Sequence, residues 1–114
     1  MTYRIIYYES SRGENFVKDF ICSLSSDGAV AKILAYIDYL SIYGPAARRP
    51  YVSYLKDKIY ELRPSFGRLE IRILFFYAAK DIVLTHGFLK KTREVPENHI
   101  TKAKEIMKEH LNIR

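Results

Sequence analysis

Arginine and lysine residues embedded in three short apolar runs are the residues of this sequence best suited to chemistry. The runs span 58–63, 68–77 and 86–96, and each contains or ends on fixed cations. Apolar runs of this length are typical of buried strands, where an arginine is costly unless it faces solvent, pairs with an acid or binds an anion. Cations from neighbouring strands of one small sheet would form a phosphate-binding surface.

Strand alternation predicts which of these side chains meet. Successive side chains of a strand point to opposite faces, so Glu61 and Arg63 share one face of the first strand. If Arg72 of the second strand lies on the same face, the two arginines converge. Lys90 or Lys91, just past the third strand, would then complete a concave cationic site. The same alternation groups the residues of the third strand into two sets, Ile82, Leu84, His86 and Phe88 against Val83, Thr85, Gly87 and Leu89.

Each candidate also has an ordinary structural explanation. Arg63 is equally consistent with a same-face ion pair to Glu61, and Arg72 has a neighbouring acid in Glu70. The pair Lys90-Lys91 is typical of an exposed strand end. A histidine such as His86, inside an apolar strand, is more often a core residue than a catalyst.

Size and composition predict one α+β domain over residues 1–114. The net charge is +6, and residues 48–114 carry fifteen Lys and Arg against eight acids, so the excess lies in the half that contains the three runs. No apolar run approaches the roughly 20 residues needed to cross a bilayer, and no signal peptide precedes the first strand. The chain is therefore expected to be cytoplasmic, with no membrane partner.

Apolar periodicity predicts the elements that must position the cations. We expect a first strand, a hairpin of two helices ended by Gly44-Pro45, an irregular connection, three antiparallel strands and a final helix begun by Pro96. One face of the sheet should be covered by the helical hairpin and the other partly by the last helix. The expected spans are strand 2–8, helices 14–24 and 30–41, connection 46–54, and strands 58–64, 69–77 and 81–88.

Several kinds of site are not indicated. The three His and the single Cys22 have no metal-ligand spacing. Glycine-rich phosphate loops and serine nucleophile elbows are also missing. We therefore expect no metal and no cofactor.

The three runs resemble a known family. Glu61-Leu62-Arg63, the run 71–76, and the element 86–92 followed by Pro96 are similar to the HigB-like, phage-derived branch of the RelE/ParE toxin superfamily. The resemblance covers nearly the whole chain and implies a RelE-like, microbial ribonuclease-like fold. It implies the toxin of a type II toxin–antitoxin module, a metal-independent endoribonuclease that cuts mRNA on the ribosome. It also implies a cognate antitoxin, of the HigA-like helix-turn-helix type, through which alone the complex contacts operator DNA.

The resemblance also implies roles for residues. Arg72 corresponds to the arginine that RelE-like toxins place on the scissile phosphate, Lys91 falls near a second cationic position, and Arg63 belongs to the cationic cluster. The expected route is attack of a 2′-hydroxyl on the adjacent phosphate, with Glu61 or His86 as candidate base. The expected RNA-binding cations are Lys56, Lys58, Arg68, Lys90 and Arg93.

Two departures leave the proton transfers open. RelE toxins carry lysines where this chain has Ile59 and Glu61, and no tyrosine follows Pro96. Two other functions stay as alternatives, a ParE-like toxin that poisons DNA gyrase and an inactive remnant that only binds its antitoxin.

Overall fold

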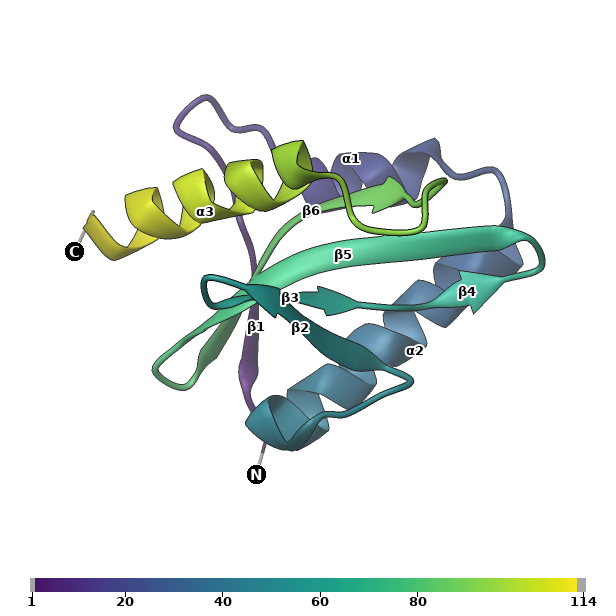
Figure 1. Ribbon diagram of the computed structural model, residues 1–114, viewed down its shortest axis with the longest axis horizontal. Coiled ribbons are helices and arrows are strands. Elements are labelled where there is room, and N and C mark those ends of the chain that lie inside the picture. The colour runs from purple at the N-terminus through teal and green to yellow at the C-terminus, as the bar shows by residue number, and fades with distance from the viewer. Residues whose placement is uncertain (1, 113–114) are drawn as a thin grey trace.

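The computed structural model describes residues 2–112 and has the α+β architecture that the sequence predicts (Figure 1). None of the helices in this part of the chain combines the length and the apolar character needed to span a bilayer. The elements are β1 Arg4–Tyr7, α1 Phe16–Ser23, α2 Asp27–Tyr43, a 3₁₀ turn at Gly44–Ala46, β2 Val52–Lys56, β3 Ile59–Leu62, β4 Ser65–Phe66, β5 Leu69–Ala78, β6 Asp81–Leu89 and α3 Glu97–Asn112.

Polar caps begin the first two helices, as their sequences suggest. Asn15 Oδ1 accepts a hydrogen bond from the Lys18 amide, and Ser26 Oγ accepts one from the Ala29 amide, both at 3.1 Å. Each cap satisfies a backbone N–H that a helix start otherwise leaves free. The second helix ends at Gly44, whose φ of 51° is a conformation that favours glycine.

The sheet has the strand order β1-β6-β5-β3-β2, and β4 pairs with the beginning of β5. The β5–β6, β3–β5 and β2–β3 pairs are antiparallel, whereas β1 pairs in parallel with β6. In Figure 1, α2 lies behind the sheet, and α3 lies on its other side, where it packs on β5 and β6.

Two strands, β2 and β4, were not predicted from the sequence. The connection 46–54 was expected to be irregular, but Val52 begins an edge strand that pairs with β3. Asp57 and Lys58 both have positive φ angles, 53° and 71°, which close the tight β2–β3 turn. The two-residue β4 was expected to be part of a turn, yet Ser65 and Phe66 pair with Glu70 and Leu69.

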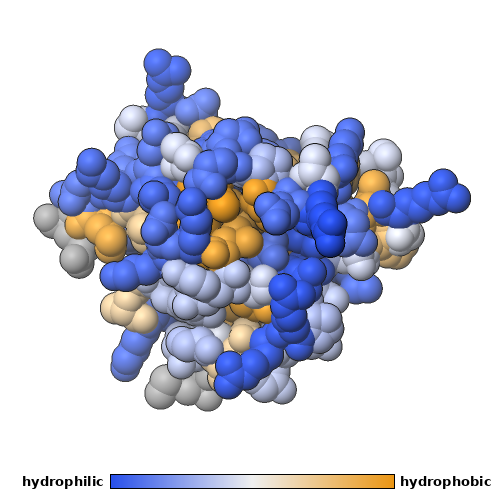
Figure 2. Space-filling model, viewed as in Figure 1, coloured by the Kyte–Doolittle hydropathy of each residue, from blue (hydrophilic) through white to orange (hydrophobic). Residues whose placement is uncertain are grey.

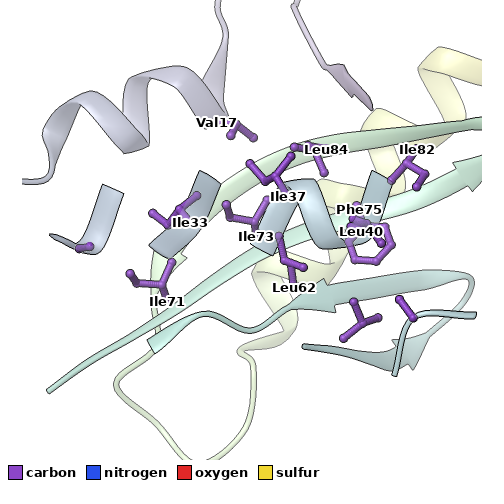
Figure 3. Packing of buried hydrophobic residues seen from close by; sticks show 13 residues of the cluster. Val17, Ile33, Ile37, Leu40, Leu62, Ile71, Ile73, Phe75, Ile82 and Leu84 are labelled. Carbon is purple, nitrogen blue, oxygen red and sulfur yellow. The ribbon is translucent and has the colours of Figure 1, made fainter. Parts of the chain in front are cut away.

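The face of the sheet that carries α1 and α2 is filled by apolar side chains from both helices and four strands (Figure 3). This cluster confirms the prediction that the helical hairpin covers one face. Its fully buried members include Val17, Ile33, Leu40, Leu62, Ile71, Ile73, Phe75, Ile82 and Leu84.

The opposite face packs against α3 through a smaller cluster. Leu74, Phe76 and Val83 of the sheet contact Ala103 and Ile106 of the helix. This cluster confirms that the last helix covers part of the second face.

A β-bulge in β6 overturns the uniform alternation expected along that strand. Leu74 pairs with His86, but the next residue, Phe75, pairs with Leu84, so Thr85 is an extra residue. Ile82 and Leu84 therefore belong to the cluster beneath α1 and α2, whereas Val83 and Phe88 belong to the cluster beneath α3. Thr85 Oγ donates a hydrogen bond to the Leu74 carbonyl at 3.1 Å, which fixes the bulge.

Candidate nucleic-acid interface

A cationic basin of about 510 Å³ opens on the α3 face of the sheet, beside the part that α3 covers. Its walls come from β2, β3, β5 and the connection between β6 and α3. Three carboxylates, Glu61, Glu94 and Glu97, also line it, so the lining carries an excess of three positive charges. The cations of the basin are Arg49, Lys56, Arg63, Arg72, Lys90 and Arg93.

Arg72 and Arg63 meet at one shared carboxylate on the floor of the basin. Arg72 Nε lies 3.1 Å from Glu61 Oε1, and Arg63 Nε lies 3.4 Å from Glu61 Oε2. The side chains of Arg72 and Glu61 are only 4% and 7% exposed, so this is a buried charge cluster. The pairing of Arg63 with Glu61 that the sequence suggests is therefore present, and Arg72 joins it.

Strand register explains why the two arginines share a face. Glu61 stands opposite Leu74 in the β3–β5 ladder, and Arg72 lies two residues before Leu74 on the same side of β5. Arg63 is likewise two residues after Glu61. The convergence predicted from alternation is therefore confirmed at this point of the sheet.

The hydrogen bonding of this cluster is incomplete within residues 2–112. Glu61 Oε1 and the Nε atoms of Arg63 and Arg72 are buried and form no directional hydrogen bond with the protein. Glu61 Oε2 accepts a hydrogen bond from Ser53 Oγ at 2.8 Å. The three atoms take part in the ion pairs of the cluster rather than in aligned hydrogen bonds, so charge is the main attraction that holds the two guanidiniums on Glu61.

Arg72 is held in place by further contacts at one end of its guanidinium. Its Nη1 donates to the Ile71 carbonyl at 2.8 Å and lies 3.5 Å from a carboxylate oxygen of Glu70. No described residue accepts a hydrogen bond from Nη2. A guanidinium has five N–H donors, so Arg72 retains donors for a ligand.

Charged side chains form the rim of the basin, and two of the lysines make one polar contact each. Lys56 Nζ lies 3.1 Å from Glu97, at the start of α3. Lys90 Nζ donates to the Arg93 carbonyl at 2.8 Å, which curls the chain after β6 toward the basin. Hydrophilic side chains dominate the face of the molecule shown in Figure 2, around a small hydrophobic centre.

Four of the residues predicted from the sequence lie elsewhere. Lys58 is in the β2–β3 turn, Arg68 is in the turn before β5, and Lys91 follows β6; all three are exposed and none lines the basin. His86 does not line it either. The structure thus brings Glu61, Arg63, Arg72 and three RNA-binding candidates together, and leaves Lys58, Arg68, Lys91 and His86 outside.

His86 is a buried core histidine with both ring nitrogens engaged. Nδ1 lies 3.0 Å from Thr85 Oγ, and Nε2 lies 3.1 Å from Nδ1 of His99 on α3. Burial, with the nearby charges of Lys102 and His99, lowers the pKa of His86 to about 3. These contacts place His86 in the packing between β6 and α3, away from the basin that would have to hold its substrate.

Several residues of the basin were not identified from the sequence, among them Arg49, Ser53 and Glu94. Arg49 and Ser53 come from the segment expected to be irregular, and Glu94 comes from the connection before α3. The alternating β-forming residues Val52 and Tyr54 are the signal that could have revealed β2, and with it Ser53.

The arrangement suits an anionic ligand that carries hydrogen-bond acceptors. Guanidinium groups bind phosphate through several N–H donors at once, and the buried cluster holds two of them at a fixed separation. Residues 2–112 contain no group of three or more His, Cys, Asp or Glu side chains that could hold a metal ion.

Comparisons with known proteins agree with this fold. Residues 19–108 match the model of the family described as phage derived protein Gp49-like (DUF891). Among solved structures, the chain is similar to one in the crystal structure of the archaeal RelE-RelB complex from Pyrococcus horikoshii OT3. The TM-score is 0.52 at 21% sequence identity, over 82% of this chain and 100% of that one. No curated protein sequence matches.

The structural similarity confirms the RelE-like fold, and the family match spans most of the chain, including the basin, β5, β6 and nearly all of α3. The protein therefore belongs to the Gp49-like, phage-derived family.

Proposed function

We propose that this protein is the toxin of a type II toxin–antitoxin module and that it cuts mRNA on the ribosome as a metal-independent endoribonuclease of the HigB-like type. The observation that carries the proposal is the buried Arg63–Glu61–Arg72 cluster at the floor of the cationic basin. Two guanidinium groups that converge on the floor of the basin suit one phosphodiester of an RNA strand.

Arg72 and Arg63 would act on the phosphate itself. When the 2′-hydroxyl attacks phosphorus, negative charge grows on the non-bridging oxygens and the bond to the 5′-oxygen breaks, which leaves a 2′,3′-cyclic phosphate. Donors that are already fixed lower the free energy of this transition state, by about 2.7–4 kcal/mol for a well-placed group. Their burial in the sheet supplies that fixed geometry.

Glu61 fits a positioning role better than the role of a base. Its oxygens already face Ser53, Arg63 and Arg72, so accepting a proton would remove the charge that holds both guanidiniums. Glu94 is the carboxylate of the basin that has no ion pair or side-chain hydrogen bond within residues 2–112. We assign to Glu94 the acceptance of the 2′-hydroxyl proton, while the 5′-oxygen is protonated from solvent.

The remaining cations would hold the substrate. Lys56, Lys90 and Arg93 surround the basin, where they can neutralise neighbouring phosphates of mRNA or of ribosomal RNA. Lys58, Arg68 and Lys91 would contribute more weakly, because they lie outside the basin on exposed turns.

An antitoxin partner is part of the proposal. The solved structure with a similar fold is a RelE-RelB complex, which supports a protein partner for this chain as well. We propose a HigA-like helix-turn-helix antitoxin, with operator DNA bound only through the complex.

The test is to map mRNA ends after induction and on purified ribosomes programmed with mRNA. Wild-type protein should generate 5′-hydroxyl and 2′,3′-cyclic ends within codons. Arg72→Lys keeps a cation beside Glu61 but loses the planar fork, so cleavage should fall by roughly 10²–10³-fold. Arg12→Lys, at an exposed arginine of the β1–α1 loop, is the matched control and should cut like the wild type.

Three results would contradict the proposal. Cleavage by Arg72→Lys at the wild-type rate would remove Arg72 from the site. A DNA-damage response without new mRNA ends would favour a gyrase poison, and harmless expression without the antitoxin would favour an inactive remnant.

A further inference from the structure

A second hollow, of about 400 Å³, lies beside the basin and has a different lining. Arg48 and Arg49 border it together with three tyrosines, Tyr54, Tyr60 and Tyr77. No carboxylate lines this tyrosine hollow, whereas three line the basin. Its chemistry is therefore cationic and aromatic.

The tyrosine hollow adjoins the basin at the edge of the sheet. Arg49, Ser53 and Tyr54 line both. Ser53 stands opposite Glu61 and Tyr54 stands opposite Tyr60, so these successive residues of the edge strand β2 point to opposite faces. A flexible chain lying in the basin can thus cross β2 and enter the hollow.

Tyr54 presents a large aromatic surface there in a fixed position. The residue is 56% exposed, yet its ring packs edge-on against Tyr60, with centroids 5.0 Å apart, and Tyr60 packs in the same way on Tyr77. The Tyr54 hydroxyl also accepts a hydrogen bond from the Lys58 amide at 3.2 Å. An exposed ring held by such contacts is suited to stacking with a flat ligand.

The two arginines stand on an ordered loop and make no ion pair within residues 2–112. The Arg48 amide donates to the Tyr39 hydroxyl at 3.4 Å, and the Arg48 carbonyl accepts from the amides of Tyr51 and Val52. Both side chains are exposed. They are thus positioned at the hollow and available to an anion.

A nucleotide combines negative charge with a flat ring, and a single-stranded nucleic acid exposes its base faces for stacking. We propose that the tyrosine hollow is a second RNA subsite, which holds the base and phosphate of a nucleotide flanking the one in the basin. Tyr54 stacks on the base, and Arg48 and Arg49 bind the phosphate. The inference rests on the proposed function for the identity of the ligand, but the hollow can be tested separately.

The test is an NMR titration of the full chain with a single-stranded tetranucleotide whose 2′-O-methyl riboses prevent cleavage. Amide shifts are expected both at Arg63 and Arg72, which line only the basin, and at Arg48, Tyr60 and Tyr77, which line only the hollow. Shifts in the basin alone would overturn the second subsite and leave the proposed function standing. Shifts in the hollow alone would overturn the proposed function and leave an RNA-binding hollow standing. No shifts in either cavity would reject the proposed function and the second subsite together.

Variants measure the contribution of each group. Tyr54→Ala should weaken binding of the tetranucleotide roughly tenfold, while Tyr54→Phe, which keeps the ring, should stay within about twofold. Arg48→Ala should weaken binding by about two- to fivefold and reduce its salt dependence. Tyr7→Ala, on the opposite edge strand β1, and Arg12→Ala are the matched controls and should bind like the wild type.

Circular dichroism and thermal melting show whether each variant is folded. Wild-type affinity in a folded Tyr54→Ala protein would overturn the proposal. If that variant binds RNA normally but no longer binds a cognate antitoxin, the hollow belongs to a protein interface instead.

Discussion

The two faces of the central sheet bury different kinds of side chains. Beneath α1 and α2, the side chains of the buried cluster are apolar throughout. Beneath α3, an apolar cluster fills only part of the face, and the Arg63–Glu61–Arg72 cluster occupies the part beside it. The same strand, β5, supplies Phe75 to the first face and Arg72 to the second.

This difference shows how a small sheet can hold a charged site without losing its core. Because the closed face supplies most of the apolar burial, the other face can leave a basin open at one end. The cost of placing a guanidinium in the sheet is offset by a carboxylate on the neighbouring strand. The face beneath α1 and α2 thus contributes most of the stability, and the opposite face of the same strands carries the candidate binding site.

The largest expected effect is on the closed face. Phe75→Ala should lower the free energy of unfolding by about 4 kcal/mol, because Phe75 is fully buried against α2. Phe88→Ala on the α3 face should cost only about 2 kcal/mol, since Phe88 lies at the margin of its cluster and is 9% exposed. Urea unfolding measures both. Equal losses would contradict the contrast between the faces.

The second prediction concerns the charge that holds the open face. Glu61→Gln keeps the shape of the side chain but leaves Arg72 buried without its closest anion, so stability should fall by about 3 kcal/mol. Glu70→Gln is the matched control, because Glu70 is 53% exposed and 3.5 Å from Arg72, and it should change stability by less than about 0.5 kcal/mol. Similar losses in the two variants would show that Glu61 does not organise the cluster.

The third prediction uses pH to probe the contact between β6 and α3. The pKa of His86 is about 3 in the folded protein, below its ordinary value of 6.5, so the unfolded chain binds the proton first as the pH falls. Stability is therefore complete above about pH 6.5 and is lost toward pH 3, by roughly 2 kcal/mol between about pH 7.5 and pH 5. His86→Gln should remove this loss. An unchanged dependence of the urea midpoint on pH would exclude His86 as its source.

The fourth prediction compares two glycines that contact aromatic rings. A Cβ at Gly87 would lie 2.6 Å from the Phe20 ring, where α1 packs on β6, so Gly87→Ala should cost about 1–2 kcal/mol. A Cβ at Gly28 would also meet a ring, that of Phe66, but Phe66 is 42% exposed and can rotate away. Gly28→Ala should therefore be tolerated, with help from the higher helix propensity of alanine. A larger loss at Gly28 in thermal melts would refute this ranking.

The smallest effect separates two adjacent lysines. Lys90 lines the basin and Lys91 does not, so Lys90→Ala should reduce mRNA cleavage by roughly three- to tenfold and Lys91→Ala by less than about twofold. Rates at low and moderate salt measure the difference. A stronger loss for Lys91→Ala would support the role that the family resemblance implies for Lys91.

The elements with strong periodicity were predictable from sequence, and the irregular ones were not. The helical hairpin, the β5–β6 hairpin and α3 follow from apolar spacing and from turn residues. The bulge at Thr85 changes the face that some residues of β6 occupy. The run 81–89 has no regular alternation of polar and apolar residues, so its sequence does not reveal a single extra residue. The edge strand β2 was hidden because Arg48, Arg49 and Pro50 precede it.

The residues of the candidate site that lie on or next to regular strands were predictable from the sequence. Glu61, Arg63 and Arg72 follow from alternation and register in β3 and β5. Arg49, Ser53 and Glu94 approach them through loops and an edge strand, whose paths depend on tertiary contacts. Lys90 and Lys91 are adjacent in sequence, so which of them lines the basin depends on the path of the chain after β6.

The parallel pairing of β1 with β6 has a consequence for biosynthesis. Arg4 lies opposite Asp81 and is joined to it by two side-chain hydrogen bonds across 77 positions of sequence. Synthesis runs from the N-terminus, so β1, the first described strand to be translated, can pair in the sheet only after β6, the last one, has been made. A truncated translation product that stops before residue 81 therefore has an unpaired leading segment and none of β6 on which to dock it.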